Sequence, residues 1–274
     1  MFSLKNNHLE VLILDPLADQ ERFGPRYCTG GYIFQIIDSN LGPLLSGPTY
    51  PDSFNWFDGQ GIPDAFNRSP LRETDSPASD DTTSLIIGIG QCDLAANQVV
   101  TFCRWAVEAG PTAIQMRTEQ AFQDFALVLT RTVTLHGRTV RSTTHLRNSG
   151  RRPIPIRWFP HPFYPQPEGD ELCCFNLPVS FPDNPAYRLA ESGFIARRGW
   201  PWRQGHFQAL DHAARENLVI LQKHPLLGLV AARCSYLPAF FPIWGNQHTF
   251  SWEPYLERTV MAGQELTWWI DYDF

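Results

Sequence analysis

Alternating apolar and polar side chains dominate the middle of the chain. The apolar members of the first run share one parity and are Phe125, Leu127, Leu129, Val133 and Leu135. This two-residue period is typical of a strand with one buried face. His136 and Gly137 then predict a tight turn, because glycine adopts positive φ without steric cost. The chain is expected to return as a second strand over residues 138–146, whose two faces carry Val140 and Leu146 on one side and Arg141, Thr143, His145 and Arg147 on the other.

A third run follows the turn predicted at Asn148, Ser149 and Gly150. It covers residues 154–159 and is interrupted by Pro153, Pro155 and Pro160. Proline cannot donate a ladder hydrogen bond, so this run predicts an edge or the beginning of a strand. It leads directly to His161.

Similar short runs recur along the rest of the chain, and no convincing amphipathic helix is visible. The further predicted strands cover residues 9–14, 31–37, 41–45, 84–90, 98–107, 112–118, 217–222, 228–234 and 266–274. A dozen or so strands without helices indicate an all-β fold, here a large antiparallel β-sandwich of two sheets. Nothing marks a domain boundary, so residues 1–274 are expected to form a single domain.

Composition narrows the possible partners. The chain has 274 residues, 43% of them hydrophobic and only 18% charged, with 23 Pro and 19 Gly, as expected for a turn-rich globular protein. A net charge of -6 argues against a nucleic-acid partner. No secretion signal and no apolar stretch of about 20 residues is visible, which predicts a cytoplasmic protein without a membrane partner. The six cysteines have no metal-type spacing and are expected to be reduced, so no metal site is predicted.

Several short motifs, taken in order, resemble the aldose 1-epimerase (galactose mutarotase-like) family. They are the turn with Asn148 and Gly150, the run His161-Pro162-Phe163-Tyr164, the early Thr29-Gly30-Gly31-Tyr32-Ile33 segment, the Trp252-Glu253-Pro254-Tyr255 segment, Gly263-Gln264-Glu265 and the closing aromatic strand over residues 268–272. The resemblance covers about residues 25–272. It implies a galactose mutarotase-like supersandwich and a cofactor-free sugar isomerase that acts at the anomeric carbon.

The resemblance implies that His161 and Glu253 are the catalytic pair. Anomers exchange by ring opening, in which a base removes the proton of the anomeric hydroxyl and an acid protonates the ring oxygen. A carboxylate and an imidazole can divide these roles near neutral pH, with Glu253 as base and His161 as acid. The two are expected to face each other across the width of a sugar ring. The alternative reading is a packed core histidine and an ordinary loop carboxylate.

Substrate-binding candidates are less sharply defined. In the family an Asn-Arg pair contacts the sugar at about the position of Asn67 and Arg68. Arg26 is a further candidate, since an arginine can bind the phosphate of a hexose phosphate, and the alternative reading is a surface charge. The remaining candidates for substrate binding are His145, Tyr164 and Asp211.

One departure from the family leaves alternatives open. The family commonly has a second histidine ahead of the hairpins, whereas this chain has none between His8 and His136, and Cys103 or Arg104 stands near that place. Another residue has taken over, the substrate differs, or catalysis has been lost. The main rival function is therefore a carbohydrate-binding protein of the same fold without turnover. Glycoside cleavage or a lyase reaction is a third reading, but nothing in the sequence pairs the extra acidic or tyrosine group that it needs. The oligomeric state stays open.

Overall fold

The computed structural model describes residues 1–72 and 82–274, and within these ranges the chain is built almost entirely of antiparallel strands. The described helical structure is one short 3-10 turn, η1 (Gln20–Arg22). No helix among the described residues has the length and apolar character that crossing a membrane requires. The all-β prediction is confirmed.

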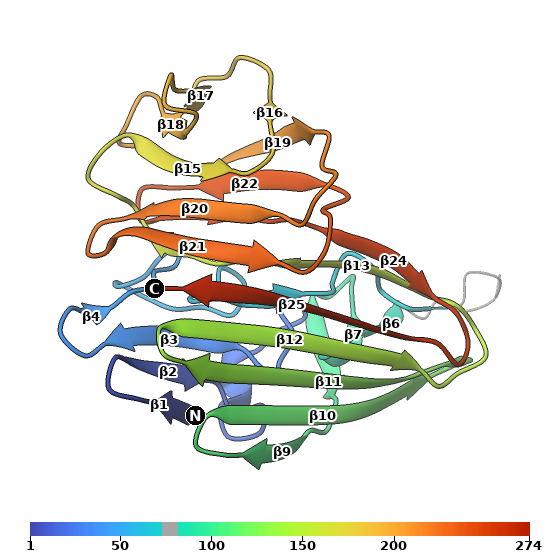
Figure 1. Cartoon of the computed structure of the whole chain (residues 1–274). Helices are drawn as coiled ribbons and strands as arrows, with labels where there is room; N and C mark the ends of the chain where they lie inside the picture. Colours follow the sequence, from blue (N-terminus) through green and yellow to red (C-terminus); the bar gives the residue numbers. More distant parts are fainter. Residues whose placement is uncertain (73–81) are drawn as a thin grey trace.

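The largest sheet has ten strands and forms one continuous layer across the molecule (Figure 1). In spatial order its strands are β17 (Tyr187–Leu189), β18 (Ile195–Arg197), β15 (Glu171–Phe175), β20 (Val219–His224), β21 (Gly228–Cys234), β25 (Glu265–Asp273), β12 (Thr139–Asn148), β11 (Phe125–His136), β10 (Ala113–Phe122) and β9 (Ala106–Ala109). The C-terminal strand β25 lies between β21 and β12, so it joins the two halves of the sheet.

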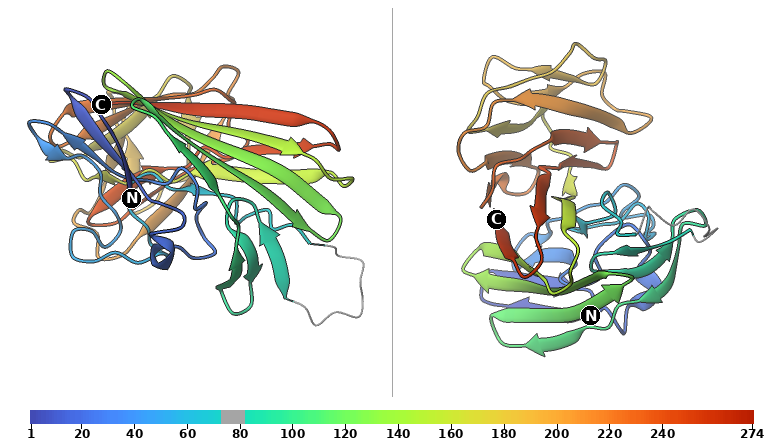
Figure 2. Two further views of the ribbon diagram at one scale, coloured as in Figure 1. Left: turned by 90° about the horizontal axis from the view of Figure 1, so that it is seen from below. Right: turned by 90° about the vertical axis from the view of Figure 1, so that its right-hand side faces the viewer.

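The other described strands form four smaller sheets. The five-stranded sheet has the order β14 (Tyr164–Pro165), β23 (Thr249–Trp252), β22 (Phe241–Gly245), β19 (His206–His212) and β16 (Val179–Ser180). A four-stranded sheet contains β1 (Phe2–Lys5), β2 (Leu9–Ile13), β3 (Ile33–Asp38) and β4 (Gly42–Pro43). Two three-stranded sheets are β24 (Leu256–Val260), β13 (Ile154–Pro160) and β5 (Asp64–Ala65), and β6 (Thr83–Ile86), β7 (Gly90–Asp93) and β8 (Gln98–Phe102). In the right-hand view of Figure 2, the ribbons form two groups, one above the other.

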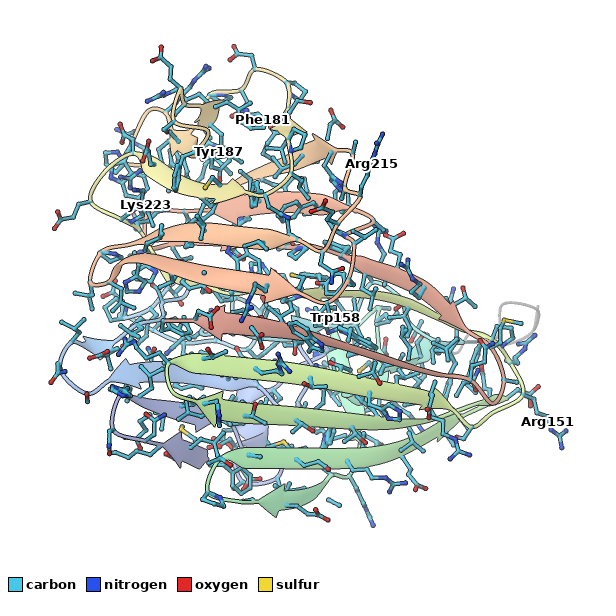
Figure 3. The ribbon with its side chains drawn as sticks, viewed as in Figure 1. Arg151, Trp158, Phe181, Tyr187, Arg215 and Lys223 are labelled. Carbon is cyan, nitrogen blue, oxygen red and sulfur yellow. The ribbon has the colours of Figure 1, made fainter. Side chains whose placement is uncertain are left out.

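The central hairpin follows the alternation seen in the sequence. Along β11 every second side chain from Phe125 to Leu135 is buried, and the glycine of the following turn, Gly137, has a φ of 58°. The buried face of β11 includes Arg131 at the position where the apolar run is interrupted. A core cluster of side chains from Leu4 to Phe274 fills the space between the sheets. Trp158 of β13 lies near its middle (Figure 3) and packs against Trp268 at 5.4 Å between ring centroids.

Each half of the proline-rich strand β13 is paired on one side, as an edge strand is. Among the described residues, Ile154 to Trp158 pair only with β24, and Phe159 and Pro160 pair only with β5. Each half therefore has one neighbour, as the prolines predicted.

Three predicted segments differ from the structure. Residues 84–90 are two strands rather than one, because β6 and β7 form a hairpin whose buried turn includes Gly88 with a φ of 74°. Residues 98–107 are likewise divided between β8 and β9. Strand β15 is not among the predicted strands, and its neighbours β18 and β20 come from later parts of the sequence. Local alternation does not reveal pairing of this kind.

The two glycines of the early Gly30-Gly31 motif each meet a bulky neighbour. A Cβ on Gly30 would lie 2.3 Å from the Trp105 ring, and one on Gly31 would lie 3.1 Å from Arg131. Gly31 also has a φ of 71°. Only glycine lets this segment approach both side chains and adopt that backbone conformation.

Candidate active site

His161 is held where β13 ends. Its backbone N–H donates to the carbonyl of Pro63 at 2.8 Å, next to the pairing of Phe159 and Pro160 with β5. The imidazole stacks on Phe163 with 4.3 Å between ring centroids. With 3% of its surface exposed, His161 is oriented by its neighbours rather than by solvent.

Glu253 follows directly after β23 and comes to the same place from the other end of the sequence. Its backbone N–H donates to the carbonyl of Pro242 at 2.9 Å, and 6% of the residue is exposed. Ser251 lies two residues earlier, so its side chain points to the same side of the strand. The two residues meet different nitrogens of the His161 ring, Ser251 Oγ at 2.9 Å from Nδ1 and Glu253 Oε1 at 3.3 Å from Nε2.

The pair is closer than the sequence suggested. We expected the imidazole and the carboxylate to face each other across a sugar ring, whereas the structure places them in direct contact. This arrangement still suits acid and base catalysis at an anomeric centre, because the anomeric hydroxyl and the ring oxygen are attached to the same carbon. Catalytic contacts of this length often tighten only when substrate binds.

Burial changes the proton affinity of both groups. It lowers the pKa of His161 well below the ordinary 6.5, and the positive charge of Arg26 lowers it further. Burial raises the pKa of Glu253 from 4.5 to about 7, although Arg26 and Arg68 oppose that change. Both shifts have the same cause, because a nearly dry site disfavours the charged form of each group. Just below pH 7 the pair therefore holds one proton, and that proton is on Glu253.

If this is the catalytic pair that the resemblance implies, its pH dependence should follow from this shared proton. Acid and base catalysis by the pair needs exactly one proton, which Glu253 loses above about pH 7. We expect kcat/KM to be level just below pH 7 and to fall about tenfold per pH unit above it, since kcat/KM reports ionisations of the free protein. The measurement is the initial rate of anomer exchange at several pH values, corrected for the uncatalysed rate. A kcat/KM that rises between pH 7 and 9 would contradict this assignment.

The pair lines a pocket of about 490 Å³ with an aromatic wall. The pocket residues include three of the candidates for substrate binding, Arg26, Asn67 and Arg68. The buried Oδ1 of Asn67 has no hydrogen-bond partner among the described residues, so it is available to accept from a ligand. The aromatic residues of the wall are Phe57, Phe159, Phe163, Phe207, Trp244 and Tyr255. Pockets with apolar walls and a few convergent polar groups are typical of small-molecule sites.

The two arginines are oriented by neighbouring rings. The Arg26 guanidinium lies 4.9 Å from the Tyr27 ring centroid and 4.8 Å from that of Phe57. Arg68 is exposed and lies near Tyr255, whose pKa is raised to about 12, mainly by burial. Neither arginine forms an ion pair with a carboxylate in the part of the chain that the structure describes.

Three other candidates lie away from this pocket. His145 is on the outer face of β12, where its Nε2 is 3.3 Å from Glu265 Oε2. Tyr164 is fully buried in the core and packs 6.1 Å from the Trp252 ring. Asp211 is exposed on β19 opposite Ser180. The structure thus brings five of the eight candidates together and separates these three, and we leave these three out of the proposed site.

The place of the absent family histidine is also outside the pocket. Burial raises the pKa of the Cys103 thiol to about 11. Neither Cys103 nor Arg104 lines the pocket, whereas Asn97 of the turn between β7 and β8 does. No described group of three or more His, Cys, Asp or Glu side chains is arranged to hold a metal ion.

Several pocket residues were not identified from the sequence. Phe57 and Asp58 belong to a mixed aromatic and polar stretch over residues 56–68, and a composition so unlike that of a simple linker was a usable signal. Trp244 and Phe207 lie on β22 and β19, which the sequence did not predict as strands. No local pattern marks them, because they become pocket residues only when the five-stranded sheet packs beside His161.

The sequence matches no protein-family model and no curated protein. Solved structures, in contrast, are similar over nearly the whole chain. A candidate aldose 1-epimerase from Escherichia coli K12 has a TM-score of 0.61 at 12% identity, covering 99% of this chain and 97% of its own. The Slr1438 protein from Synechocystis sp. PCC 6803 has a TM-score of 0.59 at 13% identity, with coverage of 99% and 94%.

A galactose mutarotase-like protein from Clostridium acetobutylicum has a TM-score of 0.57 at 12% identity, with coverage of 98% and 93%. At these identities the similarity concerns the fold. The chain therefore has the galactose mutarotase-like fold expected from the order of its motifs.

Proposed function

We propose that this protein is a sugar isomerase of the aldose 1-epimerase kind, which interconverts the anomers of a free or phosphorylated hexose. The observation that carries the proposal is the contact between His161 and Glu253 in an aromatic pocket. Both groups are nearly buried, and their pKa values are shifted in opposite directions. A titratable pair with strongly shifted pKa values inside a cleft is a common mark of a catalytic site.

The proposed reaction uses only this pair. Glu253 takes the proton of the anomeric hydroxyl while His161 gives a proton to the ring oxygen, and the bond between that oxygen and the anomeric carbon breaks. Because the free protein carries the shared proton on Glu253, it must first move to His161 Nε2, which is 3.3 Å away. Rotation about the next carbon–carbon bond and the reverse transfers then close the other anomer. Protons balance, so no cofactor is required.

The substrate is either a neutral hexose or its phosphate, and the pocket has features that suit both. The aromatic wall fits the apolar C–H face of a sugar ring. Arg26 and Arg68, which have no carboxylate partner among the described residues, suit a phosphate because the guanidinium presents a planar fork of donors.

The test is to add the protein to freshly dissolved α-glucose, α-galactose and glucose 6-phosphate, and to follow optical rotation against a blank without protein. If only glucose 6-phosphate equilibrates faster, the hexose phosphate is the substrate and the arginines bind its phosphate group. If a free sugar equilibrates faster, that sugar is the substrate. Saturable sugar binding without acceleration would favour the rival, a carbohydrate-binding protein. Absence of both binding and acceleration for all three would contradict the proposal.

The exposed ring of Phe207 should contribute to binding and not to chemistry. It lies at the pocket with 58% of its surface exposed, far more than either member of the catalytic pair. We expect Phe207→Ala to raise KM roughly threefold to tenfold at unchanged kcat, the effect of losing one aromatic contact. Leu229→Ala, which removes a 44% exposed side chain outside this pocket, is the control. A fall in kcat at unchanged KM would show that the ring acts in the transition state instead.

A further inference from the structure

Ser251 is a buried residue whose side chain has a single described hydrogen bond, and that bond goes to the proposed catalytic histidine. The residue is fully buried on β23, and its Oγ lies 2.9 Å from Nδ1 of His161. Glu253, the residue that directly follows β23, meets the other ring nitrogen. One short segment thus supplies a partner for each nitrogen of the imidazole.

The rest of the imidazole is covered mainly by aromatic rings. Phe163 stacks on it, and the Tyr27 and Trp244 rings approach at 6.2 and 6.1 Å between centroids, nearly perpendicular. The titratable and charged groups around the ring are Glu253, Arg26 and the Tyr27 phenol, whose pKa is raised well above its ordinary value, mainly by burial. Of the side chains described, only Ser251 hydrogen bonds to Nδ1.

Proton transfer at Nε2 sets a requirement on Nδ1. An imidazolium that gives up its Nε2 proton becomes a neutral ring that still carries the proton on Nδ1. That N–H needs an acceptor in a dry site, because a buried donor without a partner has lost its hydrogen bonds to water. A hydroxyl oxygen can accept this bond both before and after the transfer.

We propose that Ser251 is a positioning residue, which accepts a hydrogen bond from Nδ1 of His161 and thereby keeps Nε2 as the nitrogen that exchanges protons with Glu253 and the sugar. This role rests on the proposed function. The hydrogen bond partner of one ring nitrogen decides which tautomer a histidine adopts. Ser251 therefore determines which ring nitrogen of His161 exchanges protons, without touching the substrate.

The tautomer is measurable without any turnover. In uniformly ¹⁵N-labelled protein at pH 6, long-range proton–nitrogen spectra should show His161 as the neutral Nδ1–H form. At that pH Glu253 retains its proton, because its pKa is about 7, and so it does not compete as an anionic acceptor at Nε2. Ser251→Ala should shift His161 toward the Nε2–H form. A wild-type ring in the Nε2–H form, or identical spectra for the two proteins, would overturn the proposal.

Kinetics then tests the consequence for catalysis. With the sugar identified by optical rotation, Ser251→Ala should lower kcat about 10- to 100-fold at similar KM, by analogy with the removal of outer partners of metal-binding histidines. Ser251→Thr retains a hydroxyl and should recover part of the loss. The matched control is Ser84→Ala, since Ser84 is equally buried on β6 and its Oγ has no described hydrogen-bond partner.

The two proposals fail separately. If no sugar equilibrates faster, the proposed function fails, while the spectra still show whether Ser251 sets the tautomer. If the sugar turns over and Ser251→Ala has the same kcat as Ser84→Ala, the positioning role fails and the isomerase proposal stands.

Discussion

Glu253→Gln and His161→Asn are each expected to lower kcat for anomer exchange by about 10²- to 10⁴-fold, the usual contribution of a positioned acid or base. Glutamine has nearly the shape of glutamate but cannot take a proton from the anomeric hydroxyl. Asparagine can hydrogen bond but cannot give a proton to the ring oxygen. The measurement is the initial rate of change of optical rotation with saturating sugar, because kcat isolates the chemical steps from substrate binding.

The double variant separates a working pair from two independent residues. Groups that act as a unit are not additive, so Glu253→Gln with His161→Asn should be little slower than the slower single variant. The matched controls are His145→Asn and Glu257→Gln, since both side chains are partly exposed and lie outside the pocket. If a control variant loses as much activity as its pocket counterpart, the pair is not the catalytic site. Thermal unfolding of each variant verifies that the fold is retained.

Arg131→Met is expected to cause the largest loss of stability, about 3–5 kcal/mol in the free energy of unfolding. Arg131 forms a buried ion pair with Asp64, and the exposed fractions of the two side chains are 1% and 4%. The substitution removes one partner and leaves Asp64 as an uncompensated buried charge, which is far more costly than losing an exposed pair. Arg131 also donates to Ser142 Oγ at 2.9 Å. The measurement is urea-induced unfolding of the variant and the wild type.

Two further variants determine whether the buried charge is the cause. Arg157→Met breaks the half-exposed pair with Glu257, 2.9 Å apart, and should cost no more than about 1 kcal/mol. Adding Asp64→Asn to Arg131→Met should restore part of the loss, because the remaining partner is then neutral. A loss below about 1 kcal/mol for Arg131→Met alone would show that Asp64 is neutral or finds another partner. Since Pro63, the residue just before β5, accepts the backbone N–H of His161, loosening this segment should affect the pocket too.

The buried Arg131 shows what the alternation of apolar and polar residues along a strand does not reveal. Leu129 and Val133 share a parity with Arg131, so the strand and its faces were predictable. The pattern does not say whether a charged residue on the apolar face turns outward or finds a partner. Asp64 lies 67 positions earlier in the chain, and only folding brings it beneath β11.

The candidate site was predictable to a different degree for each residue. His161 and Glu253 were found through a resemblance in the order of motifs, and Asn67 and Arg68 through the same resemblance. Asp211 and Tyr164 were chosen by residue type, and the structure places both away from the pocket. Residue type alone carries no information about which face of a strand a side chain occupies or what that face packs against.

By itself the sequence determined the all-β class and the central hairpin with its turn at Gly137, and the resemblance of its motifs suggested His161 and Glu253 as an acid–base pair. These depend on periodicity, turn residues and local motifs, all of which are written within a few neighbouring positions. Only the tertiary structure decided that Ser251 and Glu253 meet opposite nitrogens of His161, and that Trp244 and Phe207 line the same pocket. Those contacts join segments far apart in the chain, and burial between packed sheets, not any local pattern, sets the proton affinities on which the chemistry depends.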